Sequence, residues 1–317
     1  MTQVTDSLPV DFTAVTSPQE VQRALAQHDY LADEGLTTLV YLSLRLHRPL
    51  LLEGDAGVGK TEVAKTLARW SGSELIRLQC YEGIDLAQAA YEWDHARQLV
   101  HLRTAEAAGV ATSVGVEELE SQLYHERFLI RRPLLRALES VGQVPPVLLI
   151  DELDRADDEF EAFLLEFLSE FTVTIPELGP IGAKVPPVVV ITSNRTRDLH
   201  DALKRRCLYH WVSHPSFEQE VQIVQLRAPE VSEALARQVA AMAEAVRGLG
   251  LYKPPGVAET IDWAQALHLL GETSLSMERA NATLGTAIKY REDQERVRAS
   301  GGMAALVADA IARAQAR

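Results

Sequence analysis

The segment at residues 54–61 has the residue types and spacing of a phosphate-binding loop. Together with the next residue, its members are Gly54, Asp55, Ala56, Gly57, Val58, Gly59, Lys60, Thr61 and Glu62. Glycines let the backbone curl so that successive N–H groups converge on phosphate oxygens, the lysine reaches the terminal phosphates, and the threonine hydroxyl is a ligand for Mg²⁺. We therefore predict that this segment binds ATP, with Thr61 holding Mg²⁺.

The residues on either side of this loop have the patterns of a strand and a helix. Leu50, Leu51 and Leu52 form an apolar run, which is typical of a strand buried on both faces of a parallel sheet. Residues 62–70 carry apolar side chains at helical spacing, and Gly72 follows as a helix-ending glycine. A strand, a glycine loop and a helix N-terminus in this order form an anion site, so an ordinary glycine-rich turn is the less favoured interpretation.

Two acidic residues follow a second apolar run. Residues 147–150 are Val-Leu-Leu-Ile, and Asp151 and Glu152 come directly after them. An acidic pair after a strand is common at a solvated helix N-terminus, but downstream of a phosphate loop it has the pattern of a Walker B motif. We expect Asp151 to hold Mg²⁺ and Glu152 to orient and polarise an attacking water.

A third apolar run, at residues 188–193, ends at Asn194, and two arginines follow it in the chain. Ligands of open parallel sheets bind at the carboxyl ends of the strands, so Asn194 is a candidate for holding the hydrolytic water, with a cap or turn residue as the alternative. Arg205 and Arg206 follow a predicted short helix. Either guanidinium is a candidate for reaching the nucleotide of a neighbouring subunit, and a solvated helix face is the alternative.

Composition favours a globular protein over a nucleic-acid-binding or membrane-spanning one. The chain has 317 residues, is 47% hydrophobic and carries a formal charge of −14, which opposes a sequence-independent grip on DNA or RNA. Its two cysteines, Cys80 and Cys207, are far apart, so a reducing compartment is expected. Because no apolar run has the length of a membrane span and the N-terminus lacks a signal-peptide pattern, we expect a cytoplasmic protein.

The four motifs, in this order, resemble the Walker A, Walker B, sensor 1 and arginine-finger series of AAA+ ATPases. Longer sequence segments resemble MoxR-type AAA+ ATPases in particular, most closely the CoxD-like branch. This resemblance covers about residues 30–270. The segments lie at residues 30–35, 78–85, 91–94, 192–197 and 205–211.

This resemblance implies a homo-oligomer, most often a hexamer, that uses Mg-ATP to remodel a protein client. Such proteins commonly work beside a partner with a von Willebrand A domain, and CoxD-like members are associated with the maturation of molybdenum-containing dehydrogenases. The sequence departs from the family in one place. The family commonly has a sensor 2 arginine at the start of a lid helix, whereas residues 254–260 contain no arginine; Lys253 is a possible substitute, and sensor 2 stays unassigned.

Beyond Pro215 the pattern changes from alternating strands and helices to helices alone. Ser216 and Gln219 have the spacing of a capping box, and apolar residues recur at helical spacing in residues 230–247 and 258–270. The predicted fold is therefore an α/β AAA+ P-loop core with a parallel sheet at residues 1–215, followed by an α-helical lid domain at residues 216–317.

Residues 81–126 form a long acidic stretch between the nucleotide-binding strands. We expect Tyr81, Tyr91 and Trp93 at its head to contact the client or a partner, with a helical excursion packed on the core as the alternative. A second candidate contact is a predicted hairpin at residues 172–182.

Two arrangements of Cys and His residues carry less weight. The spacing of Cys207, His210 and His214 could suit a metal, but a strand would turn the first two to opposite sides. Cys80 lacks the His and Asn arrangement of a catalytic thiol.

The function that we predict is an ATPase acting as a remodelling chaperone. One alternative is a motor acting on nucleic acid, which a basic stripe on pore-facing loops would distinguish. Another is a non-hydrolysing nucleotide switch, which the presence of Glu152 opposes. A metabolic kinase would not explain the Asn and the paired Arg residues. The client, the oligomer number and the choice between adenine and guanine are not determined by the sequence.

Overall fold

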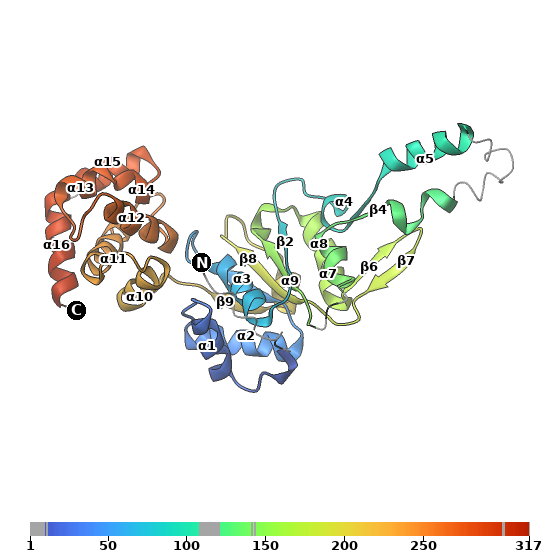
Figure 1. Ribbon diagram of the computed structural model, residues 1–317, viewed down its shortest axis with the longest axis horizontal. Helices are drawn as coiled ribbons and strands as arrows, with labels where there is room; N and C mark the ends of the chain where they lie inside the picture. The colour runs from blue at the N-terminus through green and yellow to red at the C-terminus, as the bar shows by residue number, and fades with distance from the viewer. Residues whose placement is uncertain are drawn as a thin grey trace. The chain divides into compact units, whose positions relative to one another are not determined.

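The computed structural model describes residues 10, 12–107, 121–140, 142, 144–299 and 302–316 of the chain (Figure 1). Two compact units share these residues. The first comprises the described parts of Met1–Val21, Gly35–Leu52 and Leu67–His210, and the second comprises those of Gln22–Glu34, Glu53–Thr66 and Trp211–Arg317.

A five-stranded sheet forms the centre of the α/β part. Its strands are β1 (Leu50–Glu53), β2 (Leu75–Gln79), β5 (Val147–Asp151), β8 (Val188–Ser193) and β9 (Leu208–Trp211), in the order β2-β5-β8-β1-β9. β5 pairs in parallel with β2 and with β8, and every residue of β5 is buried. The three strands predicted from uninterrupted apolar runs are confirmed, because only a strand covered on both faces requires apolar side chains at every position.

Helices connect these strands, as a parallel sheet requires. The α-helices are α1 (Pro18–Gln27), α2 (Glu34–Leu46), α3 (Lys60–Ser71), α4 (Leu86–Ala89), α5 (His95–Ala107), α7 (Pro133–Leu138), α8 (Asp158–Glu170) and α9 (Asp201–Arg206), with 3₁₀ turns η1 (Phe12–Ala14), η3 (Glu126–Phe128) and η4 (Leu153–Arg155). The predicted helix after the phosphate loop is α3, and it begins at the loop's lysine.

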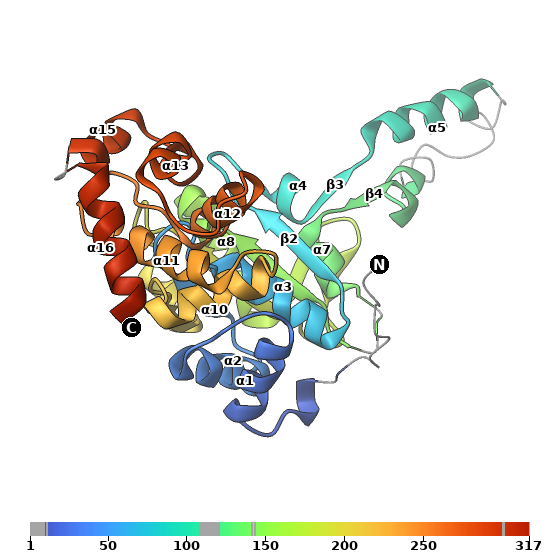
Figure 2. The same cartoon turned by 60° about the vertical axis from the view of Figure 1, so that its left-hand side comes forward.

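An arm extends from the sheet between β2 and β5. Its base is the antiparallel pair β3 (Tyr91–Trp93) and β4 (Leu129–Arg131), and α5 projects beyond that base in both views (Figures 1 and 2). A separate hairpin, β6 (Thr172–Ile175) with β7 (Gly179–Gly182), confirms the predicted hairpin before β8.

The expectation that Trp93 contacts a client is wrong. Trp93 is only 9% exposed, packs in the hydrophobic core and meets Tyr124 edge to face with ring centroids 5.3 Å apart. Tyr91 is half-buried against the same core, whereas Tyr81 is exposed. Alternation along the short strand β3 turns Trp93 inward, and the sequence alone did not reveal which side would be covered.

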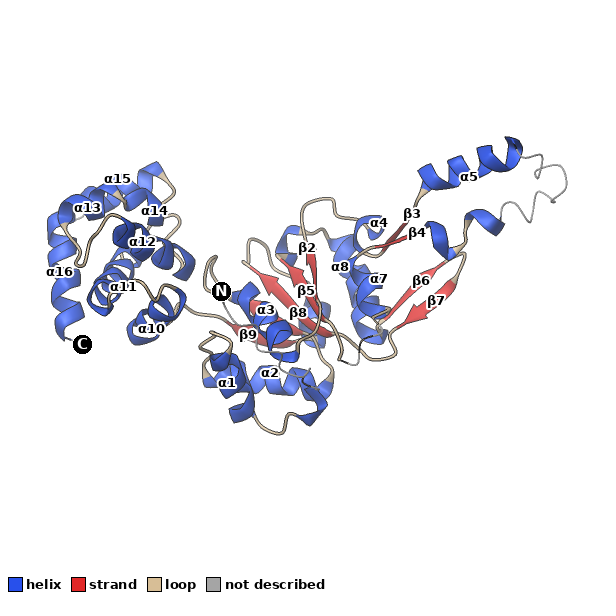
Figure 3. Ribbon diagram, in the orientation of Figure 1, coloured by secondary structure: helices blue, strands red, loops and turns tan. Residues whose placement is uncertain are grey.

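The described residues after β9 form helices and no strands (Figure 3). They are α10 (Phe217–Arg227), α11 (Glu233–Arg247), α12 (Val257–Leu269), α13 (Met277–Ala282), α14 (Leu284–Ala287), α15 (Arg291–Ala299) and α16 (Met303–Ala316), packed around their own core. Ser216 and Gln219 form the predicted capping box at the start of α10. The predicted fold class, a parallel α/β core with C-terminal helices, is confirmed. No helix in the described ranges is long and apolar enough to cross a bilayer.

Candidate functional site

The phosphate loop has a backbone that only glycine accommodates at two points. Gly54 has φ +155°, and a Cβ there would lie 2.2 Å from the carbonyl oxygen of Val212. Gly57 has φ +79°, and a Cβ there would lie 3.0 Å from Gly256. The loop thus curls as the sequence predicts and delivers the chain to the N-terminus of α3, where the positive end of the helix dipole favours an anion.

Lys60, at the first position of α3, is buried and folds back over the loop. Its Nζ atom donates hydrogen bonds to the carbonyl oxygens of Gly54 at 2.8 Å and Asp55 at 2.6 Å. The ammonium is therefore already directed across the loop, where a phosphate oxygen would compete with these carbonyls. Glu62, in the first turn of α3, forms ion pairs with Lys65 and Arg227.

The start of α12 lies directly on this loop. The backbone N–H of Val257 donates to the carbonyl oxygen of Gly57 at 2.9 Å, and a Cβ on Gly256 would come within 2.7 Å of the Gly57 Cα. Glu259 closes the turn by accepting a hydrogen bond from the Gly256 N–H at 3.0 Å. The start of α12, where the family commonly has a sensor 2 arginine, thus holds Gly256, packed closely on Gly57, and the Glu259 carboxylate.

Arg247, at the end of α11, supports this start of α12. Its guanidinium donates to both oxygens of Glu220 at 2.6 Å, to the Pro255 carbonyl at 2.8 Å and to the Thr260 hydroxyl at 3.2 Å. His214 lies nearby, with Nε2 3.7 Å from a carboxylate oxygen of Asp55 in the phosphate loop. Burial and then the Arg247 charge lower the pKa of His214, against the opposing effect of nearby carboxylates, so the ring is neutral near pH 7.

Asp151 ends β5 as a buried carboxylate with partners on both oxygens. It is 2% exposed, and its Oδ1 accepts the Thr192 hydroxyl at 2.6 Å. Its Oδ2 accepts Arg77 Nε at 3.0 Å and an Arg77 terminal nitrogen at 2.5 Å. A buried carboxylate is costly unless its oxygens have partners, so these contacts hold the Asp151 side chain in place.

Glu152 has the left-handed backbone conformation, with φ +56° and ψ +49°. This conformation is uncommon for a residue with a Cβ. Its N–H donates to the Thr192 hydroxyl at 2.9 Å, so Thr192 contacts both acidic residues. Its carboxylate accepts Asn194 Nδ2 at 3.4 Å, Gln79 Nε2 at 3.0 Å and Arg155 Nε at 3.1 Å. The structure therefore brings the two predicted water-orienting residues, Glu152 and Asn194, into contact.

Asp154 fixes the loop that carries Asn194. Its carboxylate accepts the Asn194 N–H at 3.1 Å and both the N–H and the hydroxyl of Thr196, at 2.9 Å and 2.6 Å. Burial would raise the pKa of Asp154, but these hydrogen bonds outweigh it and hold the pKa below its ordinary value. Asn194 is thus positioned by a carboxylate that is ionised near neutral pH.

Arg205 and Arg206 end α9 with exposed side chains. Arg48 holds their backbone by donating to the carbonyl oxygens of Arg205 at 2.7 Å and Arg206 at 3.2 Å. Within the described part of the chain, neither guanidinium has an ion pair or hydrogen bond. The backbone is fixed while both cations stay available to a group outside the chain.

Both cysteine sulfurs are ordinary buried thiols. Burial raises the pKa of Cys80 to about 12 and that of Cys207 to about 12, so neither is a thiolate near neutral pH. Across the described ranges, no three His, Cys, Asp or Glu residues form a group that could hold a metal ion.

Sequence reasoning missed four residues that shape this region: Arg77, Gln79, Thr192 and Arg247. Arg77 and Gln79 are two apart on β2 and so share one face, a spacing visible in the sequence, but their partners on β5 depend on strand order. Arg247 had no local signal, because it acts on a helix that begins ten residues further on.

The fold and these motifs define a P-loop nucleoside triphosphatase. The model of the family described as "ATPase family associated with various cellular activities (AAA)" matches residues 50–212, and the chain belongs to this family.

Individual relatives are more distant. A segment covering 31% of this chain is 30% identical, over 112 residues, to midasin of Giardia intestinalis, and this match spans 2% of midasin. Two variants of RuvB from Thermotoga maritima are similar in structure. One has 15% identity, a TM-score of 0.45 and coverage of 88% of this chain and 73% of RuvB; the other has 15% identity, a TM-score of 0.43 and coverage of 87% and 71%.

Proposed function

We propose that this protein is a Mg-ATP-hydrolysing AAA+ chaperone of the MoxR type, CoxD-like branch, that remodels a protein client during maturation of a metal centre. The ATPase part of the proposal rests on the contact between Glu152 and Asn194. These residues follow β5 and β8, which are neighbouring strands of the sheet. The same sheet contains β1, which leads into the phosphate loop. A nucleotide switch without hydrolysis has no need of this pair.

The residues fit Mg-ATP. The positive-φ glycines and the α3 N-terminus suit phosphates, and the hydroxyl of Thr61 with the carboxylate of Asp151 are the hard oxygen ligands that Mg²⁺ prefers. Bound Mg²⁺ would neutralise charge on the phosphates. Arg77 pairs with Oδ2 of Asp151, so Arg77 would have to release that oxygen for the whole carboxylate to be open to a cation.

The chain's own residues then divide the work of hydrolysis. Lys60 binds the terminal phosphates, while Glu152 accepts a hydrogen bond from the attacking water and polarises it. Asn194 holds the same water from the other side. Arg206, or Arg205 in its place, is presented to the nucleotide of the adjacent subunit, where its positive charge stabilises the charge that develops on the phosphoryl group.

The chaperone part of the proposal is supported by the resemblance of five longer sequence segments to MoxR-type proteins, and by the arm that α5 forms beyond the sheet. It includes a homo-oligomer, taken as a hexamer, a von Willebrand A-domain partner and a molybdenum-containing dehydrogenase as the client. It also includes a division into a nucleotide-binding core at residues 1–215 and a lid domain at residues 216–317.

Two variants test the enzymatic proposal. Lys60→Ala should lose ATP binding, because it removes contacts to the phosphates in the ground state, whereas Glu152→Gln should keep binding and lose turnover by about 10²-fold or more. ATP affinity by fluorescence titration and steady-state phosphate release separate these effects. Full turnover in Glu152→Gln would falsify the assignment of the water-orienting carboxylate.

Glu152→Gln also serves to identify the client. Because it is expected to retain ATP, it should hold clients that wild type releases, and proteins that co-purify with it and not with Lys60→Ala are the candidates. Recovery of a metalloenzyme precursor supports the maturation role. Exclusive recovery of nucleic acid contradicts it.

A further inference from the structure

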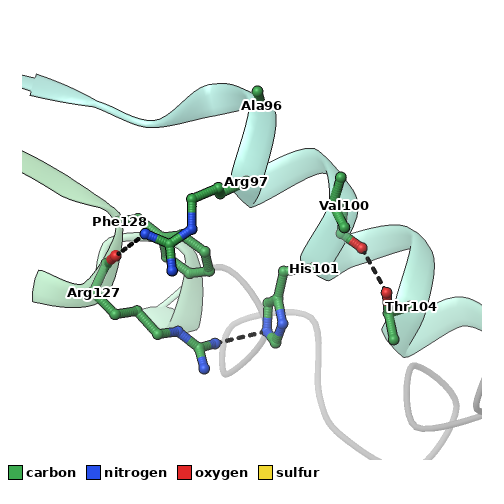
Figure 4. Close-up of a pocket in the computed structure, with 7 residues that line it drawn as sticks. All are labelled: Ala96, Arg97, Val100, His101, Thr104, Arg127 and Phe128. Carbon is green, nitrogen blue, oxygen red and sulfur yellow. Dashed lines mark hydrogen bonds between the residues drawn. The ribbon is translucent and has the colours of Figure 1, made fainter.

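A pocket lies on the arm, between α5 and the turn η3. It has a volume of about 450 Å³. The residues that line it are Ala96, Arg97, Val100, His101, Thr104, Arg127 and Phe128 (Figure 4). None of them is acidic, whereas the chain as a whole has a net charge of −14.

Two guanidinium groups dominate the chemistry of this pocket. Arg127 lies over the Phe128 ring at 4.6 Å and Arg97 at 5.9 Å, both measured from the guanidinium carbon to the ring centroid. Arg127 donates a hydrogen bond to His101 Nε2 at 2.9 Å, and Arg97 donates to the Arg127 carbonyl at 3.1 Å, as Figure 4 shows. Cation–π contacts and these hydrogen bonds hold both cations near the Phe128 ring.

These cations have little compensation from carboxylates. The Arg97 guanidinium reaches only Asp94, at 4.0 Å, and among the described residues Arg127 pairs with no carboxylate. The wall beside them is apolar and open to solvent, because Ala96 lines it and Val100 is 65% exposed. Preorganised arginines next to an exposed apolar surface are the features that anchor protein–protein contacts.

We propose that this pocket binds an acidic segment of a partner protein, with one carboxylate held between Arg97 and Arg127 and an adjacent apolar side chain against Val100 and Ala96. The pocket's role in client binding rests on the proposed function. The inference adds to that function the chemical class of the segment that is bound. Charge complementarity selects the occupant. Nucleic acid is the weaker candidate because the wall is apolar and the pocket offers two guanidiniums instead of a row of cations along a phosphate backbone.

The test uses the full-length protein and a fluorescein-labelled peptide composed of Glu, Leu and Ser, with a matched peptide in which Gln replaces every Glu. Fluorescence anisotropy should show binding of the Glu peptide that weakens with added salt, and binding of the Gln peptide weaker by about tenfold or more. Equal binding of the two peptides would overturn the proposal.

A pair of adjacent surface variants locates the site. Val100→Glu places in the pocket a negative charge, which repels the negatively charged Glu peptide, and should weaken its binding by about tenfold or more. Leu99→Glu is the control: Leu99 is also exposed, at 57%, but does not line the pocket, so its variant should bind nearly as wild type. Because both side chains are exposed, neither variant is expected to unfold the protein. Equal losses in the two variants would place binding elsewhere.

A second pair tests the arginines themselves. Arg127→Gln should lose binding, whereas Arg103→Gln, on α5 but paired with Glu106 outside the pocket, should not. The proposal is rejected in favour of a nucleic-acid site if single-stranded oligonucleotide competes at a lower concentration than unlabelled Glu peptide does.

The basal ATPase rate of Val100→Glu should equal that of wild type. If the Glu peptide does not bind while Lys60→Ala and Glu152→Gln behave as predicted, only this inference is wrong. If the peptide binds while those two variants do not behave as predicted, only the enzymatic proposal is wrong.

Discussion

At the scale of single residues, Thr192 connects the two acidic side chains of the candidate catalytic edge. Its hydroxyl donates to Asp151 Oδ1 and accepts from the Glu152 N–H, and Glu152 adopts a strained left-handed conformation at this point. Strain of this kind persists only where neighbouring contacts enforce it. The Thr192 hydroxyl is one such contact, so it should influence where the Glu152 carboxylate lies.

Thr192→Val should therefore lower the ATPase rate and stability together. Removing the hydroxyl leaves a buried acceptor on Asp151 and a buried N–H on Glu152 with one partner fewer, at a cost of about 1–3 kcal/mol. Steady-state hydrolysis and urea unfolding measure the two effects. Thr192→Ser, which keeps the hydroxyl, is the control and should retain most of the activity; a Val variant with wild-type kcat would show that the bridge does not position Glu152.

At the scale of elements, the contact between the α12 N-terminus and the phosphate loop depends on the end of α11. Arg247 joins the Glu220 carboxylate of α10 to the Pro255 carbonyl and the Thr260 hydroxyl. Glu220 is 1% exposed. Among the described residues, the Arg247 guanidinium is the cation that pairs with its carboxylate. Three helical elements are thereby tied together just behind the loop.

Arg247→Ala should destabilise the protein by about 3–5 kcal/mol, because it leaves the Glu220 carboxylate buried without its partner. The free energy of unfolding in urea gives this directly. The double variant Arg247→Met with Glu220→Leu should recover much of the loss, since it removes the stranded charge along with its partner. If the double variant is as unstable as the single one, the cost comes from lost packing rather than from the unpaired charge.

His214 gives this region a dependence on pH. Its pKa in the folded protein lies below the ordinary 6.5, so the unfolded chain takes up a proton at higher pH than the folded chain does. Its contribution to stability is therefore complete above about pH 6.5 and declines as pH falls below that value. Urea unfolding from about pH 8 to about pH 5 should show a steeper loss for wild type than for His214→Gln; identical slopes would mean that His214 titrates normally.

At the scale of the whole molecule, the role proposed for the exposed arginines of α9 predicts that activity depends on assembly. Arg205 and Arg206 have a fixed backbone and solvent-facing guanidiniums, which suits contact with a second copy of the chain. An arginine supplied from outside a site is worth about 10³-fold or more in rate. ATPase activity per subunit should therefore rise with protein concentration.

Mixing Arg206→Ala subunits with Lys60→Ala subunits should restore hydrolysis that neither variant shows alone. The Arg206→Ala subunit contributes an intact phosphate loop, and its Lys60→Ala neighbour contributes the missing guanidinium. Phosphate release is measured across mixing ratios, with Arg205→Ala in place of Arg206→Ala to decide between the two arginines. Absence of recovery with either arginine variant, together with activity independent of concentration, would exclude a role across the subunit boundary.

The sequence by itself determined the local features of this protein. Leu50–Glu53, Val147–Asp151 and Val188–Ser193 were predictable as buried strands because a doubly covered strand needs an unbroken apolar run. The phosphate loop and the capping box at Ser216 were predictable because each depends on contacts within a few residues.

Only the tertiary structure decided which distant residues meet. Strand order places Arg77 and Gln79 of β2 against Asp151 and Glu152 of β5, and helix packing places Arg247 behind the start of α12. Trp93 is buried for the same reason: the cover over its side of β3 comes from residues more than thirty positions away, including Phe128 and Leu129. The spacing of residues along the chain does not predict contacts between distant residues, because the geometry of such contacts depends on how whole helices and strands pack.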